Sequence, residues 1–117
     1  MTEKLQILLA TFNSERYLVR QLDSILAQDY QDFELLVRDG GSTDATMELI
    51  SAYQQKFPGK IIFAGQKRTK ARETFSELLK GFDADLLMFS DHDDVWMPDK
   101  ISVSIAKYEE VKQRYGA

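Results

Sequence analysis

The stretch Leu86-Leu87-Met88-Phe89-Ser90-Asp91-His92-Asp93-Asp94-Val95-Trp96 joins an apolar run to three carboxylates within four residues. A short apolar run bounded by polar residues is typical of a strand buried inside a sheet. Carboxylates at the end of such a strand suit a hard divalent cation, which takes one or two of them and fills its other positions with water and phosphate oxygens. The stretch therefore predicts a buried strand that ends at a candidate diphosphate site.

The position of these carboxylates matters more than their pattern. The chain is rich in aspartate, and a second Asp-x-Asp, Asp83-Ala84-Asp85, comes before the same apolar run, where a turn is the simpler interpretation. A motif this short arises by chance, so its placement after a buried strand is what supports a ligand site.

Three further apolar runs precede this one and have the length of buried strands. They cover residues 5–10, 33–37 and 61–64, and together with residues 86–89 they predict four strands. The first run is followed by Thr11-Phe12-Asn13-Ser14, and the second by Arg38-Asp39-Gly40-Gly41-Ser42-Thr43-Asp44. Glycines in the second loop permit a tight turn and a close approach of the backbone to a ligand.

Apolar residues that recur at spacings of three and four predict an amphipathic helix after each strand. We expect Ser14 to cap the first helix and Ser42 or Thr43 to cap the second, which Pro58-Gly59 ends. Pro98 suits the first turn of a last helix over residues 99–115. The residues expected to face the core are Leu18, Leu22, Ile25 and Leu26, then Met47, Leu49, Ile50, Tyr53 and Phe57, then Phe75, Leu78, Leu79 and Phe82, and finally Ile101, Ile105, Tyr108 and Val111.

The alternation of strands and helices predicts an α/β fold with a mostly parallel sheet flanked by helices. In such sheets ligands bind beyond the carboxyl ends of the strands. Three polar groups of residues fall there, at positions 11–13, 39–42 and 91–94. Their agreement supports a ligand site at this edge more strongly than any single motif.

Length and composition limit the possibilities further. With 117 residues, of which 44% are hydrophobic, residues 1–117 are expected to form one domain, small for an enzyme with two substrates. The net charge of −4 argues against a nucleic-acid partner. The absence of cysteine excludes disulfides and thiolate metal sites. Without an apolar run of membrane-spanning length or a signal peptide, the expected location is cytoplasmic, and a peripheral position at the inner face of the membrane stays open for a full-length protein.

Three motifs in order resemble the signatures of the family 2 glycosyltransferases, which are nucleotide-sugar enzymes. The motifs are Ala10-Thr11-Phe12-Asn13, Val37-Arg38-Asp39-Gly40-Gly41-Ser42-Thr43-Asp44 and Asp91-His92-Asp93-Asp94-Val95-Trp96-Met97-Pro98-Asp99-Lys100. The last is most similar to the rhamnosyltransferase-like branch. The resemblance implies the Rossmann-like GT-A fold of nucleotide-diphospho-sugar transferases, and transfer of a sugar from a UDP- or dTDP-sugar to an acceptor hydroxyl, with inversion, in cell-surface polysaccharide synthesis.

The resemblance also implies which residues bind the nucleotide sugar. Thr11, Asn13 and Glu15 would lie along the nucleotide pocket, and Asp39 would accept a hydrogen bond from the imide of uracil or thymine. Arg72 matches a position where family members often place an arginine near the nucleotide.

The last motif corresponds to the family's metal-binding DXD motif. Asp91 would lie near the ribose or the sugar, and Asp93 would be the main ligand of a Mn²⁺ or Mg²⁺ ion that bridges the diphosphate. The chain departs from the usual pattern at three positions: Gly40 replaces a second aspartate, Glu73 an asparagine, and His92 a glutamine.

Family members continue beyond the point that corresponds to residue 117, with a segment that binds the acceptor and supplies the carboxylate base. The resemblance therefore implies a truncated, donor-binding part of a GT-A domain, whose catalytic base lies beyond the C-terminus.

Several side chains also have simpler structural interpretations. Asp94 suits a helix cap as well as a supporting position behind a metal ligand, and Glu15 suits a helix N-terminus as well as a ligand site. The cations of residues 67–72 suit a solvated face. In an extended segment His92 should point away from the neighbouring aspartates, and Trp96 is best explained as a packing anchor.

Two other functions compete with glycosyl transfer. A sugar-phosphate nucleotidyltransferase would need a glycine-rich, basic loop after the first strand, which Thr11-Phe12-Asn13-Ser14-Glu15 does not provide. A nucleotide-binding or assembly module without turnover is the other alternative. An exposed strand edge would favour self-association of such a part.

Overall fold

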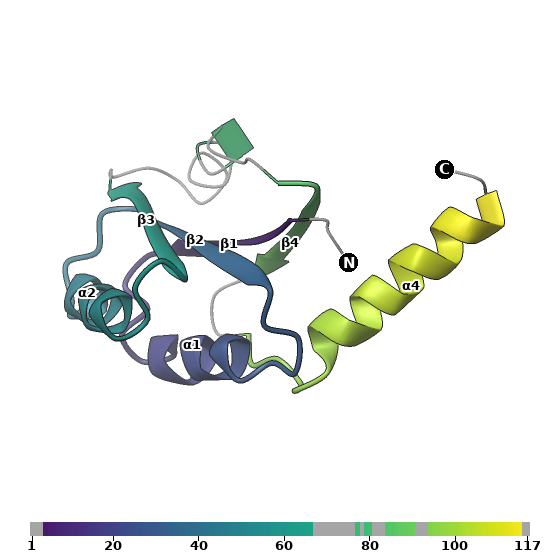
Figure 1. Ribbon diagram of the computed structural model, residues 1–117. Helices are drawn as coiled ribbons and strands as arrows, with labels where there is room; N and C mark the ends of the chain where they lie inside the picture. Colours follow the sequence, from purple (N-terminus) through teal and green to yellow (C-terminus); the bar gives the residue numbers. More distant parts are fainter. Residues whose placement is uncertain (1–3, 67–76, 78, 81–83, 91–93, 116–117) are drawn as a thin grey trace.

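The structure is a computed structural model that describes residues 4–66, 77, 79–80, 84–90 and 94–115. Strands and helices alternate along the chain, as predicted (Figure 1). Most of the predicted third helix lies outside the described residues. Leu79, which was expected to face the core from this helix, is described and is 47% exposed among the described residues, so this expectation is wrong. The elements are β1 (Leu5–Thr11), α1 (Leu18–Leu26), β2 (Phe33–Asp39), α2 (Thr46–Lys56), β3 (Ile61–Gln66), β4 (Leu86–Ser90) and α4 (Lys100–Tyr115).

The four strands form one parallel sheet in the order β3-β2-β1-β4. In the register of this sheet Thr11 pairs with Asp39, and Leu9 pairs with Ser90. Both β1 and β2 therefore run slightly further than their apolar runs, because parallel pairing continues into the polar residues. The predicted parallel sheet is confirmed, and Thr11, Asp39 and Ser90 lie near one edge of it.

An irregularity in β3 changes the register at this same edge. Val37 pairs with Phe63, whereas Asp39 pairs with Gln66, so β3 has one extra residue between these pairs. Gly65 has a φ of +122°, a backbone conformation that residues with a side chain rarely adopt. A Cβ atom at this position would also lie only 3.0 Å from Nη1 of Arg38. The glycine thus permits the bulge that brings Gln66 opposite Asp39.

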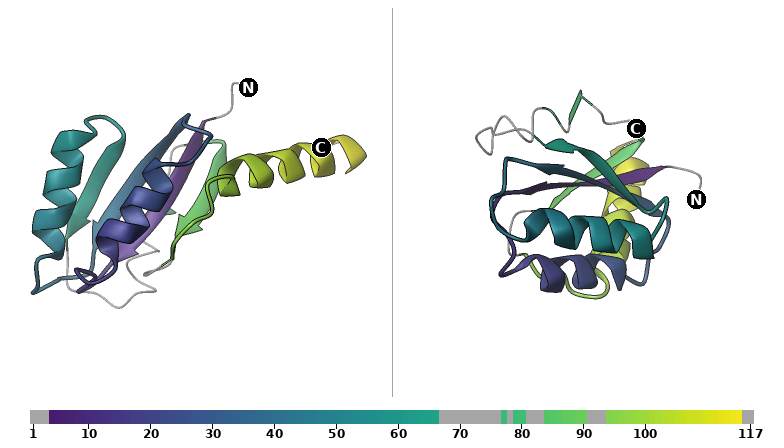
Figure 2. Two further views of the ribbon diagram at one scale, coloured as in Figure 1. Left: turned by 90° about the horizontal axis from the view of Figure 1, so that it is seen from below. Right: turned by 90° about the vertical axis from the view of Figure 1, so that its left-hand side faces the viewer.

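The main core lies between the sheet and the two helices α1 and α2, which cover the same face (Figure 2). Ile7 and Leu9 of β1 pack there with Leu22 and Ile25 of α1. Leu8 points to the other face of the sheet, where it forms a smaller buried group with Leu36. Burial on both faces explains why the two central strands, β1 and β2, are largely apolar rather than alternating.

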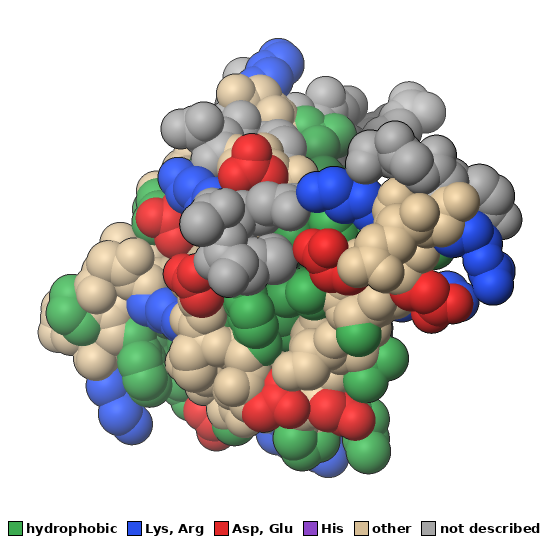
Figure 3. Space-filling view, turned by 45° about the vertical axis from the view of Figure 1, so that its right-hand side comes forward, with side chains coloured by type: hydrophobic (Ala, Val, Ile, Leu, Met, Phe, Trp, Pro, Cys, Tyr) green, Lys and Arg blue, Asp and Glu red, His purple; other side chains and the backbone are tan. Residues whose placement is uncertain are grey.

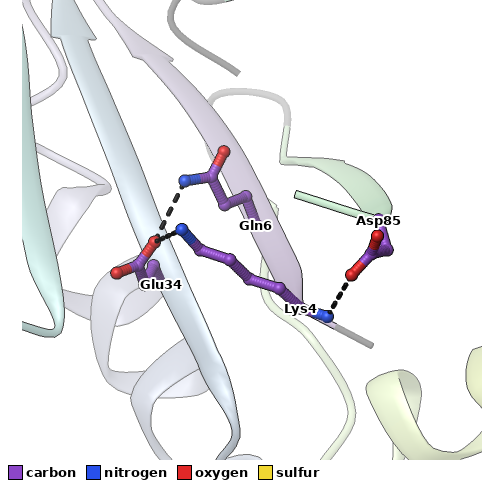
Figure 4. Close-up of polar contacts among 4 residues, drawn as sticks. All are labelled: Lys4, Gln6, Glu34 and Asp85. Carbon is purple, nitrogen blue, oxygen red and sulfur yellow. Dashed lines mark hydrogen bonds and ion pairs between the residues drawn. The ribbon is translucent and has the colours of Figure 1, made fainter. Parts of the chain in front are cut away.

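The amino ends of the strands are joined by polar contacts at the opposite edge from Asp39 (Figure 4). Lys4 Nζ lies 3.3 Å from Oε1 of Glu34, which also accepts a hydrogen bond of 3.0 Å from Gln6. This hydrogen bond and the nearby lysine outweigh partial burial and lower the pKa of Glu34. The backbone N–H of Lys4 donates to Asp85 at 2.9 Å. Asp85 thus belongs to the loop before β4, as its turn interpretation predicted.

The last helix only partly follows the prediction. Ile101 is completely buried, and Ile105 packs against the core. Tyr108 and Val111 were expected to face inward, and this expectation is wrong, because they are 37% and 44% exposed. Figure 1 shows the reason: α4 projects away from the sheet, so its C-terminal half has no layer of the described strands and helices to pack against. Figure 3, in which the right-hand side of Figure 1 is turned forward, shows hydrophobic side chains exposed among acidic and basic ones on this face.

This geometry predicts a contrast along α4. Val111→Ala should change the free energy of unfolding by less than about 0.5 kcal/mol, as for an ordinary surface substitution. Ile105→Ala should cost roughly 1–2 kcal/mol, because it removes apolar contacts with the core. Urea denaturation followed by circular dichroism measures both. Equal losses for the two variants would mean that the C-terminal half of α4 is packed in solution.

No helix in the part of the chain that the structure describes is long and apolar enough to cross a membrane.

Candidate functional site

Asp39 is the centre of a hydrogen-bond network at the carboxyl end of β2. Its side chain is 0% exposed, and its carboxylate accepts five hydrogen bonds. Oδ1 accepts from the hydroxyls of Thr11 (2.7 Å) and Ser42 (2.6 Å). Oδ2 accepts from the backbone N–H groups of Gly41 (3.0 Å) and Ser42 (2.7 Å) and from Nε2 of Gln66 (3.1 Å). The carboxylate therefore holds the ends of β1, β2 and β3 together.

The pKa of Asp39 reflects two opposing effects. Burial favours the neutral acid and would raise the pKa. The hydrogen bonds from Ser42, Thr11 and Gln66 stabilise the carboxylate and outweigh burial, so the pKa lies below its ordinary value. Asp39 is therefore ionised at neutral pH and provides a fixed negative charge at the carboxyl edge of the sheet.

The loop after β1 is joined to the loop after β2 by side chains from both. The backbone N–H of Asn13 donates to the hydroxyl of Ser42 at 2.8 Å, and Oδ1 of Asn13 accepts from the backbone N–H of Thr43 at 2.8 Å. Asn13 has a φ of +47°, a left-handed conformation that asparagine tolerates better than most residues. The two loops thus form one unit, although about thirty residues separate them in sequence.

The N-terminus of α2 is capped by carboxylates rather than by Ser42 or Thr43, so this part of the prediction is wrong. Oδ1 of Asp44 accepts from the backbone N–H of Thr46 at 2.9 Å, and Oε1 of Glu15 accepts from that of Ala45 at 2.9 Å. The hydroxyl oxygen of Ser42 already accepts from the backbone N–H of Asn13, and its hydrogen is donated to Asp39, so both of its functions are used in the loop rather than at the helix.

Ser14 does not cap α1 with its side chain, contrary to prediction. Its hydroxyl accepts from the backbone N–H of Phe12 at 3.2 Å, while its carbonyl oxygen accepts from the N–H groups of Tyr17 and Leu18, at 2.9 Å each. Because α1 begins only at Leu18, Glu15 lies before its first turn, and the carboxylate of Glu15 reaches the N-terminus of α2 instead.

The residues that follow the acidic motif pack against α1. Trp96 is 5% exposed and belongs to the main core, so its prediction as a packing anchor is confirmed. Its neighbours Val95 and Met97 are 57% and 70% exposed. On the other side of the motif, Ser90 is buried at the end of β4 and accepts a hydrogen bond of 2.9 Å from Nε2 of Gln21.

The structure brings together four of the predicted site residues: Thr11, Asn13, Glu15 and Asp39. Three others, Arg72, Asp91 and Asp93, lie outside the described residues, as does His92. Among the described residues there is no group of three histidine, cysteine or acidic side chains that could hold a metal ion. The roles of the seven residues in nucleotide-sugar and metal binding remain predictions.

Sequence reasoning missed the structural roles of Ser42, Asp44, Thr46 and Gln66 in this network. The first three follow Asp39 closely in a run of short polar side chains, a pattern that favours local turns stabilised by side-chain hydrogen bonds. This run of short polar side chains could therefore have been used to predict their hydrogen bonds. Gln66 carries no such signal, because only the bulge in β3 brings it to Asp39.

Comparison with known proteins agrees with this geometry. The model of glycosyl transferase family 2 matches residues 6–113. A dTDP-rhamnosyl transferase of Shigella flexneri is 34% identical over 102 residues, which are 83% of this chain and 35% of that protein. An uncharacterized glycosyltransferase of a Nostoc strain is 33% identical over 98 residues, which are 84% of this chain and 30% of that protein. The chain thus spans about a third of the length of these relatives.

Solved structures show the same fold. Staphylococcus aureus TarS superposes with a TM-score of 0.79 at 27% identity, over 92% of this chain and 20% of TarS. A mannosyltransferase of Pyrobaculum calidifontis, solved with GDP-Man and Mn²⁺, superposes with a TM-score of 0.81 at 20% identity, over 90% of this chain and 32% of that one. The predicted GT-A fold is therefore confirmed. By its match to the family model over most of its length, the chain belongs to glycosyl transferase family 2, as its motifs predicted.

Proposed function

We propose that this chain is the donor-binding part of a glycosyltransferase that moves a sugar from a UDP- or dTDP-sugar to an acceptor hydroxyl, with inversion, in cell-surface polysaccharide synthesis. Family membership supports the reaction class. TarS, which is 26% identical to this chain, has been solved in complex with UDP and with UDP-GlcNAc. The observation that carries the proposal is the unit of Thr11, Asn13 and Asp39 at the carboxyl edge of a parallel sheet.

The reaction defines what each part must do. The acceptor oxygen forms a bond to the anomeric carbon as the bond to the diphosphate oxygen breaks, and a base takes the proton of the hydroxyl. We propose that this base lies in a part of the protein beyond residue 117. The task of this chain is then to bind the nucleotide and to hold the departing diphosphate.

Asp91 and Asp93 are the residues that would hold a divalent cation. Asp91 directly follows Ser90, which pairs with Leu9 near the carboxyl edge of the sheet. A set of carboxylate oxygens without cysteine suits the hard ions Mn²⁺ and Mg²⁺. Such an ion, when bound, would offset the negative charge that develops on the diphosphate.

Recognition of the base by Asp39 would require an exchange of hydrogen bonds. The carboxylate of Asp39 is buried and already accepts five hydrogen bonds, of which the one from Gln66 is the longest at 3.1 Å. The imide N–H of uracil or thymine could replace the amide of Gln66 without loss of a charge-assisted hydrogen bond. Asn13 and Glu15 would line the pocket beside it, and Arg72 would lie near the nucleotide.

Calorimetric titration of UDP and dTDP into the folded chain, with and without Mn²⁺, tests the proposal. We expect binding that strengthens with Mn²⁺, and Asp93→Ala should weaken the Mn²⁺-dependent binding by about tenfold or more, a loss of about 1.4 kcal/mol. Asp85→Asn is the matched control, because Asp85 belongs to the other Asp-x-Asp motif and contacts Lys4 at the opposite edge.

Absence of nucleotide binding to folded protein would contradict the proposed donor site. Binding without any glycosyl transfer by the longer protein would favour a module without turnover. Equal effects of Asp93→Ala and Asp85→Asn would contradict the metal assignment.

We also propose a cytoplasmic location, which a composition without cysteine supports because reducing compartments do not favour disulfides. Self-association through an exposed strand edge remains a prediction. Within the described sheet β3 and β4 are the edge strands, and sedimentation velocity of the chain over a range of concentrations would measure association through either one.

A further inference from the structure

The C-terminal end of α1 is bound to the segment that follows the acidic motif. Gln28, two residues beyond this helix, is 2% exposed. Its Nε2 donates to the carbonyl oxygen of Met97 at 2.6 Å and to that of Ser24 at 3.2 Å. Its Oε1 accepts from the backbone N–H of Ile101 at 2.9 Å. One buried side chain therefore joins two segments that are about seventy residues apart in sequence.

Neighbours of Gln28 bind the same segment. The hydroxyl of Ser24 accepts from the backbone N–H of Trp96 at 3.0 Å. The backbone N–H of Asp29 donates to the carbonyl oxygen of Pro98 at 2.9 Å, and its carboxylate accepts from the hydroxyl of Ser102. We call Ser24, Gln28 and Asp29 the clasp.

The clasp binds residues that follow the acidic motif, and α1 also binds Ser90, the residue that precedes it. Gln21 donates to the hydroxyl of Ser90 at 2.9 Å, directly before Asp91. Gln21 and Ser24 are three residues apart within α1 and so lie on the same side of this helix, and Gln28 follows shortly after its end. The chain between Ser90 and Trp96 thus has both ends attached to a single rigid element.

Attached ends lower the conformational entropy that a loop loses when it binds a ligand. We propose that Gln28 is a positioning residue for the donor site, because it holds residues 97–101, which follow the acidic motif, and thereby supports metal-dependent binding of the nucleotide. This inference rests on the proposed function, because it assigns a role in binding to a residue that touches neither nucleotide nor metal.

The chemistry of the clasp requires an amide at position 28. A glutamine donates to the carbonyl oxygens of Met97 and Ser24 and accepts from the N–H of Ile101 at the same time. A glutamate of the same size could accept from Ile101 but would place an acceptor against the two carbonyl oxygens. Gln28→Glu and Gln28→Ala therefore both break the clasp, the first without a loss of volume.

Gln31→Ala provides a matched control near the same helix end. Nε2 of Gln31 donates to the carbonyl oxygens of Leu26 (3.0 Å) and Gln28 (2.6 Å), so its loss also removes two hydrogen bonds. These bonds stay within the connection between α1 and β2 and do not involve residues 96–101. A purely structural contribution should appear in both variants, whereas positioning should appear only in the Gln28 variants.

The first readout is Mn²⁺-dependent binding of UDP, measured by calorimetry at a temperature where circular dichroism shows every variant folded. We expect both Gln28 variants to weaken this binding by about tenfold, as for other residues that support metal ligands. Nucleotide affinity without metal should stay within about twofold, and so should every affinity of Gln31→Ala. Gln28 variants that bind UDP and Mn²⁺ like the unaltered chain would overturn the proposal.

The second readout does not depend on binding. Trp96 is the only tryptophan of the chain, so its fluorescence reports on the clasped segment. Acrylamide should quench Trp96 more strongly in Gln28→Ala than in the unaltered chain or in Gln31→Ala, and unchanged quenching would overturn the positioning role. If the unaltered chain binds no nucleotide, the proposed function fails, and the quenching experiment still decides whether Gln28 holds the segment.

Discussion

Replacement of Asp39 by asparagine is expected to lower the free energy of unfolding by roughly 2–4 kcal/mol. Asparagine has the same shape, but one oxygen becomes an NH₂ group that faces donors. If the NH₂ group replaces Oδ2, it faces the N–H groups of Gly41 and Ser42, which cannot accept. If it replaces Oδ1, the hydroxyls of Thr11 and Ser42 must turn to accept from it and lose the hydrogen bonds that they donate. Buried donors then lose their partner, and the remaining hydrogen bonds lose their charge assistance.

Urea denaturation at neutral pH measures this loss, with Glu34→Gln as the control. Like Asp39, Glu34 is a carboxylate that accepts a hydrogen bond from a glutamine. Unlike Asp39, it is partly exposed, lies at the opposite edge of the sheet and pairs with Lys4. A partly exposed pair of this kind contributes at most about 1 kcal/mol. A loss for Asp39→Asn no larger than that for Glu34→Gln would contradict the central role of the Asp39 network.

The same substitution should change the pH dependence of stability. The pKa of Asp39 in the folded chain lies below its unfolded value of about 3.9. Its ionised form therefore stabilises the fold fully above that unfolded value, and the contribution is lost as the pH falls through the folded pKa. As the pH falls below about 4, the unaltered chain should therefore lose stability more steeply than Asp39→Asn. Parallel curves for the two proteins would show that Asp39 does not titrate in this way.

Trp96→Ala is expected to cost about 3–5 kcal/mol of unfolding free energy, because it removes a large buried side chain and leaves a cavity in the main core. Met97→Ala is the matched control, since the neighbouring side chain is 70% exposed and should change stability by less than about 0.5 kcal/mol. Far-UV circular dichroism is the appropriate probe, because the variant has no tryptophan fluorescence.

Trp96→Phe separates loss of volume from loss of the indole. Phenylalanine retains part of the apolar contact, so its cost should lie between those of Trp96→Ala and Met97→Ala. A cost for Trp96→Ala close to that of Met97→Ala would mean that Trp96 is not packed in solution. The clasp around Gln28 would then have to be reconsidered as well, because Ser24 binds the backbone of Trp96.

Strand positions could be predicted because their signal is local. Residues 5–10 are apolar except for Gln6 and form most of the buried strand β1. Residues 86–89 are apolar throughout and form part of the parallel edge strand β4, but Phe89 is 47% exposed, so the prediction of a buried strand there is confirmed only in part. The helix caps were harder to predict, because Ser14, Ser42 and Asp44 each have several possible partners. The partner that such a side chain binds depends on which loops meet in the folded chain. At the start of α2, for example, Asn13 and Glu15 accept hydrogen bonds from the backbone of Thr43 and Ala45, thirty residues further along the sequence.

By itself the sequence determined the order of strands and helices, the family, and the edge of the sheet where the polar motifs gather, because apolar periodicity and short motifs are written in neighbouring residues. Only the tertiary structure decided that Asp39 is buried and bound by five donors, that Gln66 reaches it through a bulge at Gly65, and that Gln28 holds the chain after the acidic motif. The hydrogen bonds from Gly41 and Ser42 to Asp39 are local, whereas those from Thr11 and Gln66 to Asp39, and that from Gln28 to Met97, join residues more than twenty-five positions apart. These long-range contacts form only when the sheet and its helices pack together. The direction of α4 is likewise set by packing, which is why Ile105 contacts the core whereas Tyr108 and Val111 are exposed.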